Sequence, residues 1–338
     1  MDREPLFELR RRTFDAPGFR GVTFIEVEAK TIINAVPGSF LPFRWTINPY
    51  RGCTHACAYC FARVTHTYLD MDGGRDFETK IVVKVNAPEV LRAQLASRRW
   101  KGEPIAMGTA TDPYQRAEGR YGLMRGILAV LIERRNPFSI LTKGTLILRD
   151  LDLLARAARV TDVATALSVG TLDEDAWRRS EPGTPHPRAR LEAVRALNEA
   201  GVPCGVLVAP VLPGITDHPR QLRAVVEAAI EAGATHVSPI LLHLRPGVRE
   251  LFLPWLERNY PDLVPRYEEL YRTSAYGPAA ARRDLARRVR GLVRALGGLP
   301  PSPGAAGARW ARGAGPSADP AGRPAAAGDR RAQQLTLV

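Results

Sequence analysis

Cysteine and lysine are scarce in this chain of 338 residues, and their scarcity narrows the class of protein to which it can belong. Cysteine occurs four times, and three of the four fall within eight residues, so the chain lacks the spread pairs of a disulfide framework. Long apolar runs are also missing, and we expect no membrane span. The first residues are charged, without the apolar stretch of a secretory signal. These absences together predict a cytoplasmic protein.

Lysine is the second scarce type. Only five of the 48 basic residues are lysine and the other 43 are arginine, against 35 acidic residues, which leaves a formal charge of +13. Such a balance favours anionic partners, nucleic acid above all. The alternative is that richness in arginine and alanine reflects the base composition of the genome.

The three grouped cysteines, Cys53, Cys57 and Cys60, are spaced C-x3-C-x2-C. Several thiolates at one point are typical of a metal or cluster site. A structural zinc site needs a fourth ligand, which His55 or His66 would have to supply. A [4Fe–4S] cluster usually takes four thiolates, so three would leave one iron open to a small molecule. The remote Cys204 is expected to be a small buried apolar residue.

This motif, with an aromatic residue before its third cysteine, resembles that of the radical SAM superfamily. The wider sequence NPYRGCTHACAYCFAR is similar to the branch related to spore photoproduct lyase, and the likeness extends over roughly residues 20 to 260. The resemblance implies that the open iron binds S-adenosylmethionine (SAM). It also implies that an electron from a flavodoxin- or ferredoxin-like donor cleaves SAM, and that the resulting 5′-deoxyadenosyl radical abstracts a hydrogen atom from the substrate.

Apolar strands alternate with amphipathic helices after the motif, which predicts an α/β fold with a parallel sheet. Strands are expected at 23–34, 44–48, 81–85, 104–108, 138–142, 163–169, 204–211 and 236–242. Helices are expected at 87–99, 119–135, 146–158, 188–200, 218–232, 248–258 and 278–296. About six such units follow the cluster strand, too few for an eight-unit barrel. The resemblance implies a partial (β/α)6 TIM-type barrel, with its active site at the carboxyl ends of the strands.

The composition divides the chain into four parts. Residues 1–38 are an N-terminal extension, 39–260 the radical SAM core, 261–297 a C-terminal helical segment with a basic helix, and 298–338 a disordered tail rich in Gly, Pro, Ala and Arg. The last peptide, from Gln334 to Val338, resembles the short peptides by which bacterial DNA-repair proteins bind the sliding clamp. We treat that similarity as a hypothesis about a partner.

Polar residues at the strand ends are the next candidates for the cofactor site. By resemblance, Tyr59 holds the adenine side of SAM, whereas the alternative is a plain aromatic wall. The superfamily often has Gly-Gly-Glu after the next barrel strand; here Thr109, Thr111 and Asp112 stand near that place. The remaining candidates are similar to SAM-contacting residues of the relatives, or face the SAM carboxylate from a helix N-terminus. They are Lys143, Ser168 and Arg188, with Arg190 as the alternative to Arg188.

One feature departs from spore photoproduct lyase, which returns a hydrogen atom from a cysteine. No cysteine lies between Cys60 and Cys204, and Thr109 stands in the neighbourhood where the lyase has its hydrogen-returning cysteine. Tyr114 is a candidate to return the hydrogen atom in its place. The sequence therefore predicts a radical SAM enzyme acting on nucleic acid, DNA above all. The alternatives are RNA, a peptide or a small molecule as substrate, or a non-enzymatic zinc or iron–sulfur protein that binds nucleic acid.

Overall fold

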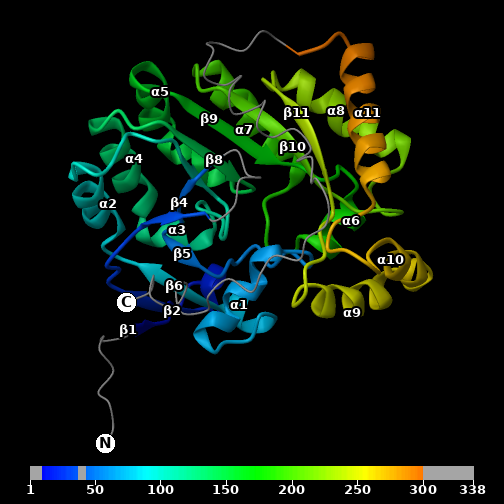
Figure 1. Cartoon of the computed structure of the whole chain (residues 1–338), viewed down its shortest axis with the longest axis horizontal. Helices are drawn as coiled ribbons and strands as arrows, with labels where there is room; N and C mark the ends of the chain where they lie inside the picture. The colour runs from blue at the N-terminus through cyan, green and yellow to red at the C-terminus, as the bar shows by residue number, and fades with distance from the viewer. Residues whose placement is uncertain (1–9, 37–42, 300–338) are drawn as a thin grey trace, which may run out of the picture.

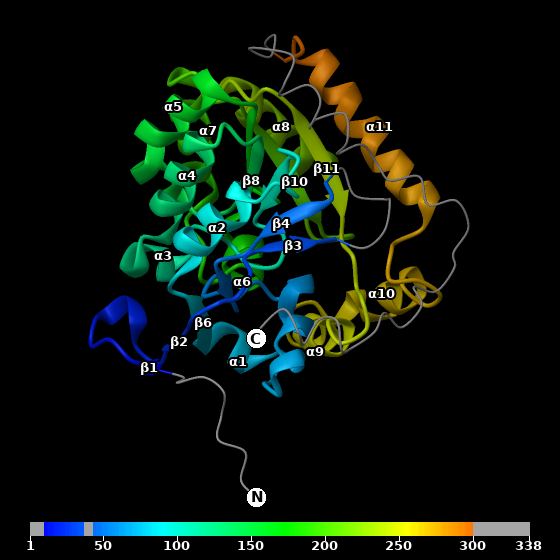
Figure 2. The ribbon, with the colours of Figure 1, turned by 60° about the vertical axis from the view of Figure 1, so that its left-hand side comes forward.

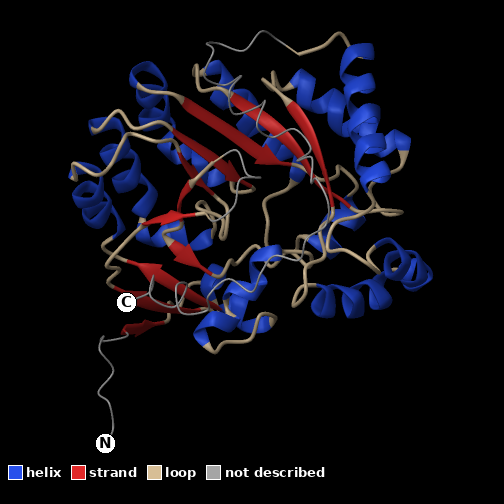
Figure 3. Cartoon of the chain, in the orientation of Figure 1, coloured by secondary structure: helices blue, strands red, loops and turns tan. Residues whose placement is uncertain are grey.

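The computed structural model describes residues 10–36 and 43–299. The peptide from Gln334 to Val338 and almost all of the predicted tail lie outside the described residues. The described chain forms two sheets, one of seven strands and one of four, with helices on the outside of the larger sheet (Figures 1 and 3).

The larger sheet contains six parallel strands and has the order β11-β10-β9-β8-β7-β4-β3, in which β3 (Ile33–Ala35) runs antiparallel to β4. The parallel strands are β4 (Trp45–Ile47), β7 (Ile105–Met107), β8 (Phe138–Thr142), β9 (Val163–Ser168), β10 (Cys204–Val211) and β11 (Val237–Leu241). Within the described ranges, the edge strands β3 and β11 do not pair with each other, so the barrel is partial. The predicted fold class is confirmed.

The helices of the strand–helix units pack outside this sheet. They are α2 (Ala87–Ala96), α4 (Leu123–Glu133), α5 (Leu151–Val160), α7 (Pro187–Glu199), α8 (Pro219–Glu231) and α11 (Ala279–Ala295). Strand β10 shows why such strands lie at the centre, because all but two of its residues are buried. Helices α7 and α8 are each capped by a histidine and begin with Pro-Arg; the histidine ring accepts a backbone N–H and proline fills the first helical position.

The smaller sheet has the order β1-β2-β6-β5 and lies beside the barrel, next to α1 (Arg75–Thr79). Its strands are β1 (Arg10–Arg12), β2 (Thr23–Val27), β6 (Lys80–Lys84) and β5 (Tyr50–Arg51). The expected strand at 81–85 therefore belongs to this sheet and not to the barrel. The single strand expected at 23–34 is also wrong, because β2 and β3 are separate strands in different sheets.

Two expected helices need correction. The segment 119–135 is divided into α3 (Arg116–Tyr121) and α4 at Gly122, whose φ of +64° ends the first helix. The segment 146–158 starts as a 3-10 helix, Thr145–Asp150, before α5 begins. Sequence analysis also missed α6 (Glu174–Ser180) and α10 (Val264–Leu270), both of which are short.

After β11 the chain forms α9 (Arg249–Asn259) and α10 and then returns along the sheet as α11. Helix α11 packs against β11 and α8 (Figure 2). Its buried side chains are Leu285, Ala286 and Val289, while Arg283 and Arg290 are among its exposed arginines. The basic helix is thus present as expected. None of the described helices is long and apolar enough to cross a membrane.

Two glycines within helices test this packing. A Cβ at Gly291 in α11 meets no heavy atom within 4 Å, so Gly291→Ala should raise the free energy of unfolding by about 0.5–1 kcal/mol. A Cβ at Gly126 in α4 would lie 2.6 Å from Cγ of Pro88 at the start of α2, so Gly126→Ala should lower stability by about 1–3 kcal/mol. Chemical denaturation of both variants measures the difference. Equal effects of the two substitutions would contradict the described contact between α2 and α4.

Candidate functional site

The cysteine loop begins after the short strand β5, which follows β4 along the chain, and is fixed at its start by neighbouring elements. The backbone N–H of Cys53 donates to the carbonyl oxygen of Phe77 at 2.9 Å. The carbonyl oxygen of Gly52 accepts from Oγ1 of Thr111 at 2.7 Å and from Nε2 of Gln115 at 2.9 Å. The side chain of Gln115 also accepts from the backbone N–H of Thr54. The segment after β7 therefore holds the loop in place by hydrogen bonds to its backbone.

Close backbone contacts at two glycines explain why no larger residue stands there. Gly52 has a φ of +80°, and a Cβ on it would lie 2.8 Å from the carbonyl oxygen of Phe77. A Cβ on Gly183 would lie 2.2 Å from the carbonyl oxygen of Thr54, and the Gly183 N–H donates to the carbonyl oxygen of His55. The loop around residue 183 thus packs directly on the cysteine loop.

All three cysteines of the motif are free thiols, and Cys53 and Cys57 are each only 6% exposed. Burial raises the pKa of Cys53, and nearby Asp112 and the other two cysteines raise it further. Burial likewise raises the pKa of Cys57 to about 12, with Glu181 adding to the effect. Three thiolates therefore need a positive group in this loop. A cationic iron–sulfur centre fits this donor set, since its ligands must be deprotonated.

Each histidine near the motif has one ring nitrogen in contact with a group other than the cysteines. Nδ1 of His55 lies 3.3 Å from the carboxylate of Asp112, and Nε2 of His66 lies 2.9 Å from the carbonyl oxygen of Lys80. Among residues 10–36 and 43–299, no group of three His, Cys, Asp or Glu side chains is placed to hold a single metal ion. No described contact joins His55 or His66 to the three cysteines as a fourth zinc ligand, although Nδ1 of His66 is buried without a hydrogen-bond partner.

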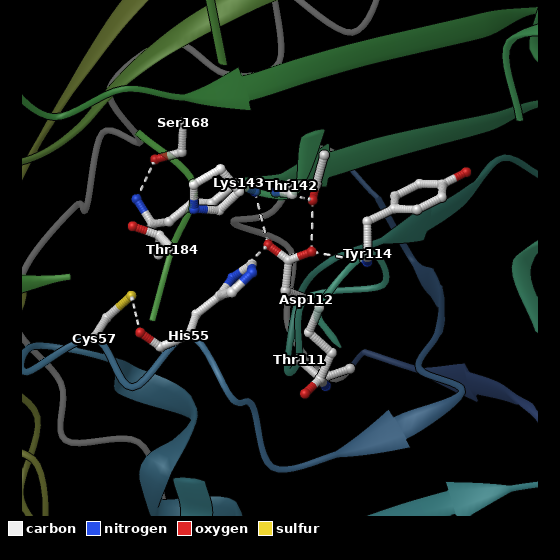
Figure 4. A network of polar contacts seen from close by, with 12 residues as sticks. His55, Cys57, Thr111, Asp112, Tyr114, Thr142, Lys143, Ser168 and Thr184 are labelled. Carbon is white, nitrogen blue, oxygen red and sulfur yellow. Dashed lines mark hydrogen bonds and ion pairs between the residues drawn. The ribbon is translucent and has the colours of Figure 1, made fainter. Parts of the chain in front are cut away.

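Asp112 lies at the centre of the polar network in Figure 4. Besides His55, its carboxylate accepts from Oγ1 of Thr142 at 2.5 Å, from the backbone N–H of Lys143 at 2.7 Å and from that of Tyr114 at 2.9 Å. Burial alone would raise the pKa of Asp112, but His55 and these hydrogen bonds together hold that pKa below its usual value. Asp112 is therefore an ionised residue that links β7, β8 and the cysteine loop.

Lys143, at the end of β8, points toward the ends of the next two strands. Its Nζ donates to Oγ of Ser168 at 2.7 Å, to Oε1 of Glu181 at 2.9 Å and to the carbonyl oxygen of Ala209 at 3.2 Å. The same Nζ lies 5.7 Å from the ring centroid of Tyr59. The network therefore joins the carboxyl ends of β8, β9 and β10 to the cysteine loop.

Glu181 is the second carboxylate of the site, and it is buried. It accepts from the Tyr59 hydroxyl and from Lys143, and its Oε2 lies 2.6 Å from Nη2 of Arg190, which is fully buried on α7. Burial would raise the pKa of Glu181, but Arg190 and Lys143 outweigh burial and lower that pKa to about 2. Arg190 also donates to the carbonyl oxygen of Ser168 at 2.9 Å. This ion-pair network fixes Tyr59 and Lys143 relative to each other.

The structure brings together only some of the residues that the sequence suggested. Tyr59, Lys143 and Ser168 converge. Thr109 is 3.4 Å from Asn48 Oδ1, and the Thr111 and Asp112 side chains are already bound to protein groups. Arg188 is exposed on α7, whereas the alternative considered with it, Arg190, is buried in the network. No contact of Arg188 with the site is described, and its predicted role stays a prediction.

Sequence analysis did not single out Glu181, His55 as a partner of Asp112, or Gln115. Glu181 stood in a loop rich in proline and glycine, which indicated a stiff turn but gave no sign of its partners. Tyr114, considered as a hydrogen donor, is buried, and its ring points away from Cys57 in Figure 4. Burial raises its pKa, with nearby Asp150 adding to the shift.

Comparison with known proteins gives consistent results. The family model described as the radical SAM superfamily matches residues 47–226, which include the cysteine motif and the strands from β7 to β10. An uncharacterized protein of Mycobacterium tuberculosis is 50% identical over 283 residues, covering 83% of this chain and 83% of the relative. A radical SAM Nalpha-GlyT isomerase of Pseudomonas phage M6 is 27% identical over 192 residues, covering 56% of this chain and 37% of the isomerase.

Solved structures of spore photoproduct lyase share the fold. One mutant structure has a TM-score of 0.60 with 16% identity and covers 81% of this chain and 79% of the lyase chain. The lyase complexed with dinucleoside spore photoproduct has the same TM-score with 15% identity and the same coverage. The match to the family model spans more than half of the 338 residues. The chain therefore belongs to the radical SAM superfamily, whose members are enzymes that depend on an iron–sulfur cluster and S-adenosylmethionine.

Proposed function

We propose that Cys53, Cys57 and Cys60 hold one [4Fe–4S] cluster, that SAM binds beside it, and that the enzyme acts on nucleic acid, DNA first. The observation that carries the proposal is the group of three free thiols on one loop at the carboxyl ends of the parallel strands. Cluster and SAM, when bound, supply an electron and a 5′-deoxyadenosyl radical that takes a hydrogen atom from the substrate. A flavodoxin- or ferredoxin-like protein is the proposed source of the electron.

The chain's own residues would position the cofactors. The three thiolates bind iron, and the hydrogen bonds from Thr111 and Gln115 to Gly52 keep the loop from shifting. Lys143 already uses each of its three N–H donors on the protein, the longest contact being 3.2 Å to Ala209. In this proposal the SAM carboxylate takes the place of the Ala209 carbonyl, because an ionised acceptor makes the stronger hydrogen bond with a cation.

Tyr59 and Ser168 complete this part of the proposal. The hydroxyl of Tyr59 is tied to Glu181, so its ring has a fixed orientation beside Lys143. The hydroxyl of Ser168 donates to the Ala209 carbonyl at 2.6 Å and accepts from Lys143. In this proposal the side chains of Tyr59 and Ser168 orient SAM beside the ammonium group of Lys143.

The nucleic-acid part of the proposal has separate support. The formal charge of +13 favours a polyanion, and a neighbour of the same fold is named as a lyase complexed with a dinucleoside. The sequence has no cysteine between Cys60 and Cys204. A reaction that returns a hydrogen atom from a cysteine in that segment is therefore not proposed.

The test is release of 5′-deoxyadenosine by anaerobically reconstituted, reduced protein with SAM. We expect slow release without substrate, and faster release with intact or ultraviolet-damaged DNA. Chromatography of the digested DNA then shows whether the lesion is converted to undamaged nucleotides, because reversal of a pyrimidine dimer leaves the mass unchanged. If no nucleic acid changes the rate of 5′-deoxyadenosine release, the proposed substrate is wrong. If cluster-loaded protein releases no 5′-deoxyadenosine at all, the proposed chemistry is wrong.

Matched cysteine variants locate the cluster. Cys57→Ala should lose the bound iron and all release of 5′-deoxyadenosine, whereas Cys204→Ala, which changes a buried thiol on β10, should keep both. Iron content is measured beside activity and thermal unfolding. Retention of a full cluster in Cys57→Ala would refute the ligand assignment.

A separate prediction concerns Glu181. Glu181→Gln leaves Lys143 and the buried Arg190 without their carboxylate, and should lower the free energy of unfolding by about 3–5 kcal/mol at pH 7. Glu174→Gln, at an exposed ion pair, should change it by less than about 1 kcal/mol.

The effect of Glu181 should also depend on pH. Its folded-state pKa of about 2 is below the ordinary value of 4.5, so its contribution is fully present above about pH 5. The difference between wild type and Glu181→Gln should therefore shrink as the pH falls from 4.5 toward 2. Denaturant titrations at several pH values measure it, and a constant difference would contradict the network.

A further inference from the structure

A group of aromatic and cationic side chains lies next to the cysteine loop and is not used by the network around Lys143. Phe61 directly follows Cys60 and begins the 3-10 helix Phe61–Thr65. Arg245 comes just after the carboxyl end of β11, and an isolated bridge pairs His243 with Tyr276, shortly before α11. We call Phe61, Arg245, Tyr276 and Arg282 the rim patch.

The two halves of the rim patch are far apart in sequence but meet at the barrel opening. In Figures 1 and 2 the segment after β11 runs down beside the segment that follows the cysteine loop. A Cβ on Gly247 would lie 2.6 Å from Cγ1 of Val64, so the backbone at residue 247 packs directly on the helix that Phe61 begins. Substrates of parallel α/β barrels enter at this end of the strands.

The contacts within the patch stack cations on rings. Cζ of Arg245 lies 5.9 Å from the ring centroid of Phe61, and its Nη2 donates to the Tyr276 hydroxyl at 3.2 Å. Cζ of Arg282 lies 5.8 Å from the Tyr276 ring centroid. Phe61 is 48% exposed, the most of the three exposed large hydrophobic residues in the described chain. Its ring is therefore available to a ligand, unlike a ring that fills the core.

The positive charge of the patch is not balanced by the protein. Neither Arg245 nor Arg282 has a carboxylate within 4.0 Å among the described residues, and Nε of Arg282 is buried without a hydrogen-bond partner. Burial, with smaller contributions from Arg245 and Arg282, lowers the pKa of His243 to about 4, so this histidine is neutral at pH 7. Two unpaired guanidinium groups beside exposed aromatic surface favour a ligand that is both anionic and flat.

We propose that the rim patch docks a single strand or an unpaired nucleotide of the substrate, with a base stacked on Phe61 and a phosphate held by Arg245 and Arg282. Exposed rings that stack bases, combined with arginines on the backbone, are the physical basis of single-strand binding. The inference deepens the proposed function and rests on its nucleic-acid substrate. It predicts that the substrate reaches the site as a strand opened from the duplex, since stacked and paired bases do not reach the ring.

The test is fluorescence anisotropy with the full-length, cluster-loaded protein and a labelled single strand of about 12 nucleotides. Phe61→Ala and Arg245→Ala should each weaken binding by about tenfold, while Phe61→Tyr should bind like the wild type. Arg245→Ala should also reduce the slope of log K against log salt concentration by about 1 in magnitude, because one phosphate contact is lost. Phe61→Ala should leave this slope unchanged. Arg290→Ala, which removes an equal charge from the exposed side of α11, should change affinity by less than about twofold.

The outcomes separate this inference from the proposed function. Iron content and thermal unfolding show whether each variant is folded and loaded. If DNA stimulates release of 5′-deoxyadenosine by the wild type but Phe61→Ala and Arg245→Ala bind the strand normally, the rim patch proposal alone is wrong. The rim patch proposal is also wrong if Arg290→Ala weakens binding of the strand as much as Arg245→Ala does. It is wrong as well if Phe61→Ala and Arg245→Ala bind the strand normally and only slow the reduction of the cluster by an acidic redox protein. If the wild type neither binds nor responds to nucleic acid, both proposals fail.

Discussion

The site depends on two carboxylates, Glu181, which is buried, and Asp112, which is largely buried, and both need cationic or hydrogen-bonding partners because an unpaired charge in the interior is strongly destabilising. Asp112 and Glu181 each contact a residue between the cysteines of the motif, His55 and Tyr59 respectively. Lys143 connects the two, since its backbone N–H donates to Asp112 and its Nζ donates to Glu181. The cysteine loop is thus fixed to the strand ends through one lysine and two carboxylates.

This arrangement holds the thiols in position although a loop carries them. Backbone hydrogen bonds from Ala58 to Ser180 and from Gly183 to His55 bring the loop before α7 against the cysteine loop. Arg190 secures the same loop from α7, and Thr111 and Gln115 secure the cysteine loop from the side of β7. The rim patch, with the exposed ring of Phe61 and the guanidinium of Arg245 above it, lies outside this framework and is the surface that we propose for the substrate.

Sequence reasoning predicted those features that depend on local pattern. The bounds of β10 match the expected strand 204–211, because a short apolar run bounded by Pro203 and Pro213 is typical of a buried strand. The cysteine spacing likewise identified the family. The helix expected at 119–135 failed at Gly122, where a left-handed residue outweighed the apolar periodicity on both sides. The strand expected at 81–85 exists but pairs in the smaller sheet, and no local pattern specifies a pairing partner.

The site itself was only partly predictable. Lys143 and Ser168 were identified by their places at strand ends and do meet. Glu181 was not, because its partners Tyr59 and Lys143 lie 122 and 38 residues away and the pairing exists only in three dimensions. Thr111 was expected to contact the cofactor because it stands near the place of the superfamily's Gly-Gly-Glu, whereas its hydroxyl donates to the backbone of the cysteine loop.

We propose that three thiolates leave one cluster iron open to SAM. Electron paramagnetic resonance of the reduced, cluster-loaded protein with and without SAM tests for this open iron. We expect SAM to change the cluster spectrum of the wild type, and the same change to need a higher SAM concentration in Lys143→Ala. A spectrum that saturating SAM leaves unchanged in the wild type would contradict an open iron, and with it the proposed chemistry.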